Sequence, residues 1–190
     1  MKTVAVIGTG IMGAGIAAGF IAQNIPVAIL GRSKDKADAC LEKALALAKK
    51  IGMTGDNATK EEADIRRQQF TGILEDWQDW NQVSWVIETV AENLELKKQV
   101  FKYLDQVVPT DIPIGSNSSA YPISKIAEGL KTAERMMGAH YFMPAEVVPL
   151  VEIVMGEKTS IQSAQEVCEL YKSANKKPVL VKKDIPGFLA

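Results

Sequence analysis

The chain has 190 residues, of which 47% are hydrophobic and 24% charged, proportions typical of an ordinary globular domain. Lysine and arginine number 22 against 23 aspartates and glutamates, and the formal net charge of -1 argues against a nucleic-acid partner. We expect one compact domain over residues 1–190, of a size that needs neither disulfides nor a structural metal.

Along the chain, short apolar runs alternate with longer stretches of helical period. We predict strands at Thr3 to Ile7, Pro26 to Leu30, Phe70 to Leu74, Ser84 to Thr89, Ile112 to Ser116, Arg135 to Phe142, Leu150 to Met155 and Pro178 to Val181. We predict helices at Ile11 to Gln23, Lys34 to Ile51, Thr59 to Gln69, Leu94 to Val107, near Pro122, and at Ser160 to Ser173. The alternation favours an α/β fold with a doubly wound, mainly parallel sheet. Thr59 is the expected cap of its helix, and Pro113 is awkward for a central strand.

Two cysteines, Cys40 and Cys168, stand far apart, form no CxxC pair and fit predicted helices, which favours a reducing compartment. The first apolar run has five residues before it breaks into glycines, so it is too short for a signal peptide. The sequence contains no run of 18 apolar residues, the length that a helix needs to span a bilayer. We therefore expect a cytoplasmic protein without a membrane partner, although the mature form of an organellar protein also fits.

Glycines gather directly after the first predicted strand, where Gly8, Gly10 and Gly13 form a GxGxxG pattern. The first glycine makes a tight turn, the second lets a pyrophosphate approach the backbone, and the third lets the helix pack on the strand. The free N–H groups at the helix start, Ile11 and Met12, face the phosphates. Because a strand precedes this pattern and a helix follows it, the pattern favours a Rossmann-type dinucleotide site over a merely flexible turn.

The cofactor itself is indicated by the end of the second predicted strand, where an acidic residue ordinarily binds the adenosine ribose of NAD. Gly31 stands in that place and is followed by Arg32, Ser33 and Lys34. A missing carboxylate and three donors favour NADP slightly over NAD. The same residues also fit a solvated helix start in which Arg32 stacks on the adenine of either cofactor.

The chain has a single histidine, His140, and a single carboxylate, Glu152, within the apolar run 150–155. If the two strands that carry them form an antiparallel hairpin centred on Glu146, the two residues face each other. The carboxylate would then hold one ring nitrogen and leave the other to take a proton near neutral pH. The pair therefore indicates a base and the group that orients it.

Taken together, these residues resemble the cofactor-binding domain of the L-3-hydroxyacyl-CoA dehydrogenase family. Matching stretches are GTGIMGAGIA from Gly8, ETVAENLELKKQVF from Glu88, SNSSAYPI from Ser116, GAHYFMPAEVVPLVEIV from Gly138 and the closing KDIPGFLA. They follow the family order and cover nearly the whole chain apart from residues 52–80. The resemblance implies an oxidoreductase of fatty acid metabolism that interconverts an L-3-hydroxyacyl-CoA and the 3-ketoacyl-CoA with a nicotinamide cofactor.

The resemblance also implies roles. His140 would be the general base for the 3-hydroxyl, Glu152 its partner, and Ser119 a donor to the substrate oxygen. Glu92 and Lys97, together with Asn117, would lie at the cofactor. By themselves, Ser119 also fits a helix cap ahead of Pro122, and Glu92 and Lys97 fit a solvated helical turn.

Two residues depart from the family pattern, because Met143 replaces an asparagine and Pro149 a lysine. They leave open a free 3-hydroxy acid as the substrate, and a non-catalytic cofactor-binding module is the second alternative. The family chain also continues beyond PGF into a helical domain that closes the cleft and forms a homodimer. We expect the present chain to bind cofactor but to turn over weakly without that part.

Overall fold

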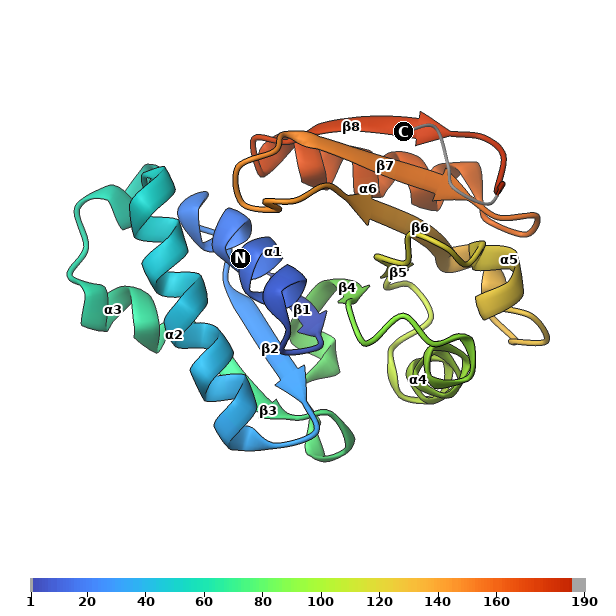
Figure 1. Ribbon diagram of the computed structural model, residues 1–190, viewed down its shortest axis with the longest axis horizontal. Helices are drawn as coiled ribbons and strands as arrows, with labels where there is room; N and C mark the ends of the chain where they lie inside the picture. The colour runs from blue at the N-terminus through green and yellow to red at the C-terminus, as the bar shows by residue number, and fades with distance from the viewer. Residues whose placement is uncertain (1, 186–190) are drawn as a thin grey trace.

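The computed structural model describes residues 2–185, so the last five residues of the closing KDIPGFLA motif lie outside the described part. It contains one eight-stranded sheet in the order β3-β2-β1-β4-β5-β6-β7-β8 (Figure 1). The strands are β1 (Thr3–Ile7), β2 (Val27–Gly31), β3 (Phe70–Ile73), β4 (Val83–Glu88), β5 (Ile114–Ser116), β6 (Met136–Tyr141), β7 (Leu150–Met155) and β8 (Lys177–Val181). Every neighbouring pair is parallel except β6 and β7, which confirms the predicted fold class.

Helices cover both faces of this sheet. They are α1 (Ile11–Ala22), α2 (Lys34–Ile51), α3 (Glu62–Arg67), α4 (Leu94–Val107), α5 (Ile123–Ile126) and α6 (Ile161–Ser173). Buried residues of α1, α2 and α6 form one core with the sheet, and those of α4 and α5 form the other (Figure 1). In β1, Val4 and Val6 point to the first core while Ala5 and Ile7 point to the second, as the two-residue period of a strand requires. The sheet is thus buried on both faces.

The stretch between α2 and β4 differs from the prediction. The helix expected from Thr59 to Gln69 is only the six-residue α3, and a short 3-10 turn, Gly55–Ala58, precedes it. Thr59 does not cap the helix; it ends the 3-10 turn, and its hydroxyl donates to the Asp56 carbonyl at 3.4 Å. The prediction of a threonine cap was therefore wrong, because the turn before the helix captures that side chain.

Pro113 does not interrupt the central strand β5, which begins one residue later. Its carbonyl accepts a hydrogen bond from the Val86 N–H of β4 at 3.2 Å. A proline lacks only the donor, so it is accommodated at the entry of a central strand. Within residues 2–185, none of the helices has both the length and the apolar character needed to cross a bilayer.

The strand order places the glycine turn at a topological switch point. After β1 the chain runs outward to β2 and β3, and it then crosses back to β4 on the other side of β1. Loops that leave the carboxyl ends of β1 and β4 consequently diverge, and open α/β sheets bind ligands in the crevice so formed.

Candidate active site

The glycine turn after β1 has two positions that exclude a side chain and one that leaves space. Gly8 has φ +121°, and a Cβ there would lie 2.5 Å from Thr89 Oγ1. A Cβ on Gly13 would lie 2.3 Å from the Gly8 carbonyl oxygen, whereas one on Gly10 would meet nothing within 4 Å. Gly8 and Gly13 therefore shape the turn and the helix packing, and Gly10 leaves the helix start open to a ligand.

The first turn of α1 presents its backbone donors without competition. Gly10 is the N-cap, no side chain caps the helix, and the first turn holds no acidic residue. Ile11 is 77% exposed and Met12 lines a small cavity described below. Free N–H groups and the positive end of a twelve-residue helix suit the phosphates of a dinucleotide.

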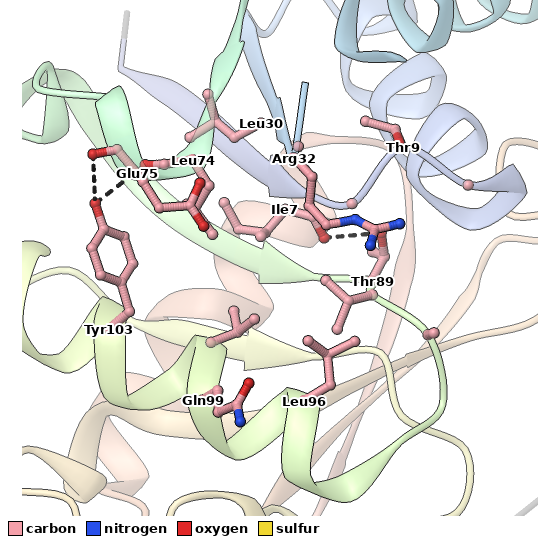
Figure 2. Close-up of a pocket in the computed structure, with 16 residues that line it drawn as sticks. Ile7, Thr9, Leu30, Arg32, Leu74, Glu75, Thr89, Leu96, Gln99 and Tyr103 are labelled. Atoms are coloured by element: carbon pink, nitrogen blue, oxygen red, sulfur yellow. Dashed lines mark hydrogen bonds between the residues drawn. The ribbon is translucent and has the colours of Figure 1, made fainter. Parts of the chain in front are cut away.

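A cavity of about 630 Å³ opens beside this turn (Figure 2). Its walls come from the glycine turn, the end of β2, the segment after β3, the segment after β4 and one face of α4. Gly8, Gly10, Gly31 and Arg32, four of the residues predicted to bind the cofactor, are among them. The cavity has the position and size expected of an adenosine site.

The residues that follow β2 are arranged differently from the expected phosphate cluster. The Ser33 hydroxyl accepts the Lys36 N–H at 3.4 Å and so caps α2. Lys34 Nζ donates to Asp38 Oδ1 at 2.5 Å and to Thr71 Oγ1 at 2.6 Å. Of the three donors that favoured NADP, the structure thus leaves Arg32 in the cavity, while the other two are engaged outside its walls.

His140 and Glu152 face each other across β6 and β7, as the predicted hairpin requires. The register pairs the two residues, and His140 Nδ1 lies 2.9 Å from Glu152 Oε2. Both side chains are buried, at 7% and 2% exposure. A carboxylate accepts hydrogen bonds, so Nδ1 carries the proton, and Nε2 is left as an acceptor.

Ser119 lies on the other side of the imidazole. Its Oγ is 3.1 Å from His140 Nε2, so with the proton on Nδ1 the hydroxyl donates to Nε2. The helix-cap role that Ser119 also fitted belongs to its neighbour, because Ser118 Oγ accepts the Tyr121 N–H at 2.9 Å. Glu152, His140 and Ser119 therefore form a continuous hydrogen-bonded line.

Glu88, at the end of β4, is a buried carboxylate that was not among the predicted site residues. Its Oε1 accepts from Lys97 Nζ at 2.9 Å and from the Val90 N–H at 2.6 Å, and its Oε2 accepts from Ser116 Oγ at 2.7 Å. Glu88 and Lys97 are 0% and 1% exposed. Burial raises the pKa of Glu88, and these partners oppose that shift. Glu152 was predicted as a site residue because it is a single carboxylate in an apolar strand. Glu88 is likewise the single carboxylate of the predicted strand 84–89, so the same pattern would have identified it.

A second cavity of about 210 Å³ lies next to the line of polar residues. Met12, Glu92, Lys97, Asn117 and Ser119, all predicted site residues, line it. It shares Thr89 and Val90 with the larger cavity, so the segment after β4 separates the two. His140 and Glu152 lie behind Ser119 rather than in the wall. Lys97 is buried against Glu88 and does not form the solvated turn that it also fitted.

The two departures from the family pattern occupy different places. Met143 lines the small cavity with its side chain 66% exposed, where an amide would offer a donor. Pro149 lines neither of the two cavities and contributes instead to a separate hollow with Gly19 and Lys176. Of the two, Met143 is the one that changes the wall beside Ser119.

Comparison with known proteins identifies a family that this chain matches. The family model described as "3-hydroxyacyl-CoA dehydrogenase, NAD binding domain" matches residues 3–185. A peroxisomal fatty acid beta-oxidation multifunctional protein of Arabidopsis thaliana is 34% identical over 181 residues, which are 95% of this chain and 25% of that protein. The 5-formyl-3-hydroxy-2-methylpyridine 4-carboxylate 5-dehydrogenase of Mesorhizobium japonicum is 31% identical over 192 residues, covering 100% of this chain and 60% of that protein.

Solved structures agree with the sequence relatives. The 3-hydroxybutyryl-CoA dehydrogenase of Escherichia coli superposes with a TM-score of 0.85 at 32% identity, covering 99% of this chain and 39% of that one. The (S)-3-hydroxybutyryl-CoA dehydrogenase of Ralstonia eutropha gives 0.87 at 29% identity, covering 100% and 66%. The chain therefore spans about a quarter of the length of the Arabidopsis thaliana protein. It spans between two fifths and two thirds of the length of these two dehydrogenases.

Proposed function

This chain belongs to the 3-hydroxyacyl-CoA dehydrogenase family through its NAD-binding domain, and on that premise we propose that it oxidises the 3-hydroxyl of a hydroxyacyl-CoA reversibly with NAD(H). The observation that carries the proposal is the hydrogen-bonded line of Glu152, His140 and Ser119 beside a cavity that adjoins the glycine turn. It combines a base, its orienting carboxylate and a hydroxyl donor at the edge of a dinucleotide fold.

The residues present fit a dinucleotide. The open space at Gly10 and the uncapped start of α1 suit the phosphates, and the larger cavity suits the adenosine half. Asn117, Glu92 and Lys97 line the smaller cavity, which suits the nicotinamide half. When bound, the nicotinamide supplies the hydride acceptor or donor.

The chain's own contribution to the chemistry is the handling of one proton. Because Glu152 accepts from Nδ1, the lone pair of His140 Nε2 is directed toward Ser119, which lines the small cavity. In the oxidative direction Nε2 takes the proton of the substrate hydroxyl, and Glu152 stabilises the imidazolium that results. In the reverse direction the same nitrogen returns the proton, while the Ser119 hydroxyl hydrogen-bonds the substrate oxygen.

We propose NAD(H) rather than NADP(H) as the cofactor. The slight preference for NADP came from the missing carboxylate at Gly31 and from the donors that follow it. Of these donors, Ser33 and Lys34 have other partners. The description of the matching family, an NAD binding domain, supports the same choice.

The test of the proposed function is His140→Ala in the protein that carries this chain. We expect turnover to fall about 10²- to 10⁴-fold, because a positioned general base contributes about that much. Binding of NADH should change little, since His140 lies outside both cavity walls. Glu152→Gln, which removes the charge that holds His140, should also lower turnover. Its matched control is Glu157→Gln, at an exposed carboxylate just beyond β7, which should keep full activity. Unchanged turnover in His140→Ala would instead favour the non-catalytic cofactor-binding module.

A second candidate is a free hydroxy acid or a related carboxylate as substrate. It is favoured by the exposed Met143 in the cavity wall and by the relative whose name describes a pyridine carboxylate. Initial rates on acetoacetyl-CoA and on short 3-hydroxy acids separate the two candidates. Absence of any rate on the thioester would remove the favoured version.

Two further points stay proposals. The cytoplasmic location is supported by the thiols of Cys40 and Cys168, which are both buried and unbridged. A homodimer of the full-length protein, formed through a helical domain, is supported by the family resemblance alone. Fluorescence microscopy of the tagged protein and size-exclusion chromatography with light scattering test these points.

A further inference from the structure

A side chain at position 31, where a carboxylate usually recognises the adenosine ribose, would have to displace Thr9 in this chain. A Cβ on Gly31 would lie 2.7 Å from the Thr9 methyl carbon, a distance that real Cβ atoms do not show. Thr9, the residue between the first two glycines of the turn, therefore occupies the space of any side chain at the tip of β2.

Another carboxylate reaches the same edge of the sheet from the neighbouring strand. Gly31 pairs with Ile73 in the parallel register of β2 and β3, and Glu75 follows two residues later. The Tyr103 hydroxyl of α4 lies 3.2 Å from the Leu74 carbonyl oxygen and 3.3 Å from that of Glu75. Figure 2 shows this attachment and the Glu75 side chain in the cavity that also holds Arg32.

The cavity wall carries one charge of each sign, and its carboxylate is the group that favours a ribose hydroxyl over a phosphate. Among the described residues that form the wall, Glu75 is the sole carboxylate and Arg32 the sole cation. A carboxylate accepts hydrogen bonds from a 2′-hydroxyl and repels a 2′-phosphate. Lys34, which would offset that repulsion, is paired with Asp38.

We infer that Glu75, delivered from the end of β3, replaces the missing carboxylate of β2 and selects NAD(H) against NADP(H) by binding the adenosine 2′-hydroxyl. The inference rests on the proposed function, because it names the group that recognises the cofactor of the same site. It assigns the selectivity to a residue outside the glycine turn and outside β2.

The experiment titrates NADH and NADPH into the chain and three variants of it, with nicotinamide fluorescence as the readout. The wild-type chain should bind NADH about tenfold or more tightly than NADPH, and Glu75→Gln should remove most of that ratio, since one charge near a phosphate has an effect of about this size. Asp76→Asn is the matched control, because the neighbouring exposed carboxylate does not line the cavity. Arg32→Ala should weaken NADPH more than NADH.

A second titration uses NADH that lacks the 2′-hydroxyl. This analogue should bind the wild-type chain about tenfold more weakly than NADH does. Glu75→Ala, which removes the acceptor that Glu75→Gln would keep in its amide oxygen, should bind the analogue and NADH equally well. A Glu75→Gln variant that binds NADH and keeps the wild-type ratio of the two cofactors would overturn the inference. A wild-type chain that binds neither dinucleotide would overturn the proposed function itself, so the two failures are distinguishable.

Discussion

Two buried carboxylates organise the site, and they do so by the same physical rule. A charge removed from water is tolerated when a partner and further hydrogen bonds surround it. Glu152 is held by His140 across a pair of strands, and Glu88 is held by Lys97, Ser116 and the Val90 backbone. The first pair presents a proton acceptor, while the second fixes the loops after β4 and β5 on either side of the small cavity.

The Glu88 and Lys97 pair leads to a prediction about pH. Burial raises the pKa of Glu88, and Lys97 opposes the rise, so Lys97→Met should raise that pKa further. Between the unfolded and the raised folded pKa the native state binds more protons than the unfolded state, so stability falls as pH rises through that window. We expect Lys97→Met to lose about 3 to 5 kcal/mol of unfolding free energy near pH 7 and clearly less near pH 5.

Urea denaturation at the two pH values measures this difference. The matched control is the double variant Glu88→Gln with Lys97→Met, which buries no charge at either position. Its unfolding free energy should lack the pH dependence that Glu88 causes in Lys97→Met. An equal loss in Lys97→Met at both pH values would contradict the prediction, because it would mean that Glu88 does not titrate in the window.

At the scale of the element, the turn between β1 and α1 separates two uses of glycine. Gly8 and Gly13 are required by contacts inside the protein, with Thr89 and with the Gly8 carbonyl. A Cβ on Gly10 would meet no protein atom within 4 Å, so packing does not require a glycine there, and the close approach of a ligand accounts for it. The same GxGxxG pattern therefore contains a packing requirement and a binding requirement at different positions.

Substitution of each glycine by alanine tests that separation. Gly13→Ala should cost about 2 to 3 kcal/mol of stability, since the new methyl group would overlap a backbone oxygen. Gly10→Ala should change stability by less than about 1 kcal/mol, yet it should weaken NADH binding about tenfold or more. Thermal unfolding and fluorescence titration measure the two effects. A Gly10→Ala variant with undiminished NADH affinity would rule out the proposed approach of the phosphates.

At the scale of the whole molecule, the order of the strands brings the site together. Residues from the ends of β1, β2, β3, β4 and β5 meet at one edge of the sheet, and the antiparallel pair β6 and β7 places His140 next to them. The two cavities meet at Thr89 and Val90, where the chain leaves β4. A ligand that fills both would connect the outer strands β2 and β3 with the central strands.

This arrangement predicts a strong thermal shift on binding the complete dinucleotide. At a concentration 100 times its dissociation constant, NADH should stabilise the fold by about 2.7 kcal/mol, or about 5 to 10 °C for a chain of this size. AMP and nicotinamide mononucleotide at the same concentration should each give a smaller shift, because each fills one cavity. Differential scanning calorimetry measures all three, and an AMP shift as large as that of NADH would show that the second cavity is not used.

Hydrophobic periodicity and residue spacing were sufficient to predict much of the fold. The strand Thr3–Ile7, the helices Lys34–Ile51 and Leu94–Val107 and the strand Leu150–Met155 have the predicted bounds. The His140 and Glu152 pairing followed from the symmetry of one hairpin, a local relation that a sequence contains. Prediction was poorest in residues 52–81, where short turns compete for the same polar side chains.

The amino-acid sequence by itself determined the alternation of strands and helices, the glycine turn and the pairing of His140 with Glu152, because each depends on neighbours in the chain or on a single hairpin. Only the tertiary structure decided which donors remain in the larger cavity, that Lys97 is buried against Glu88, and that Glu75, which follows β3, lines the same cavity as the end of β2. The physical reason is that these contacts depend on strand order and on competition among partners distant in the chain. Both arise only when the sheet has formed.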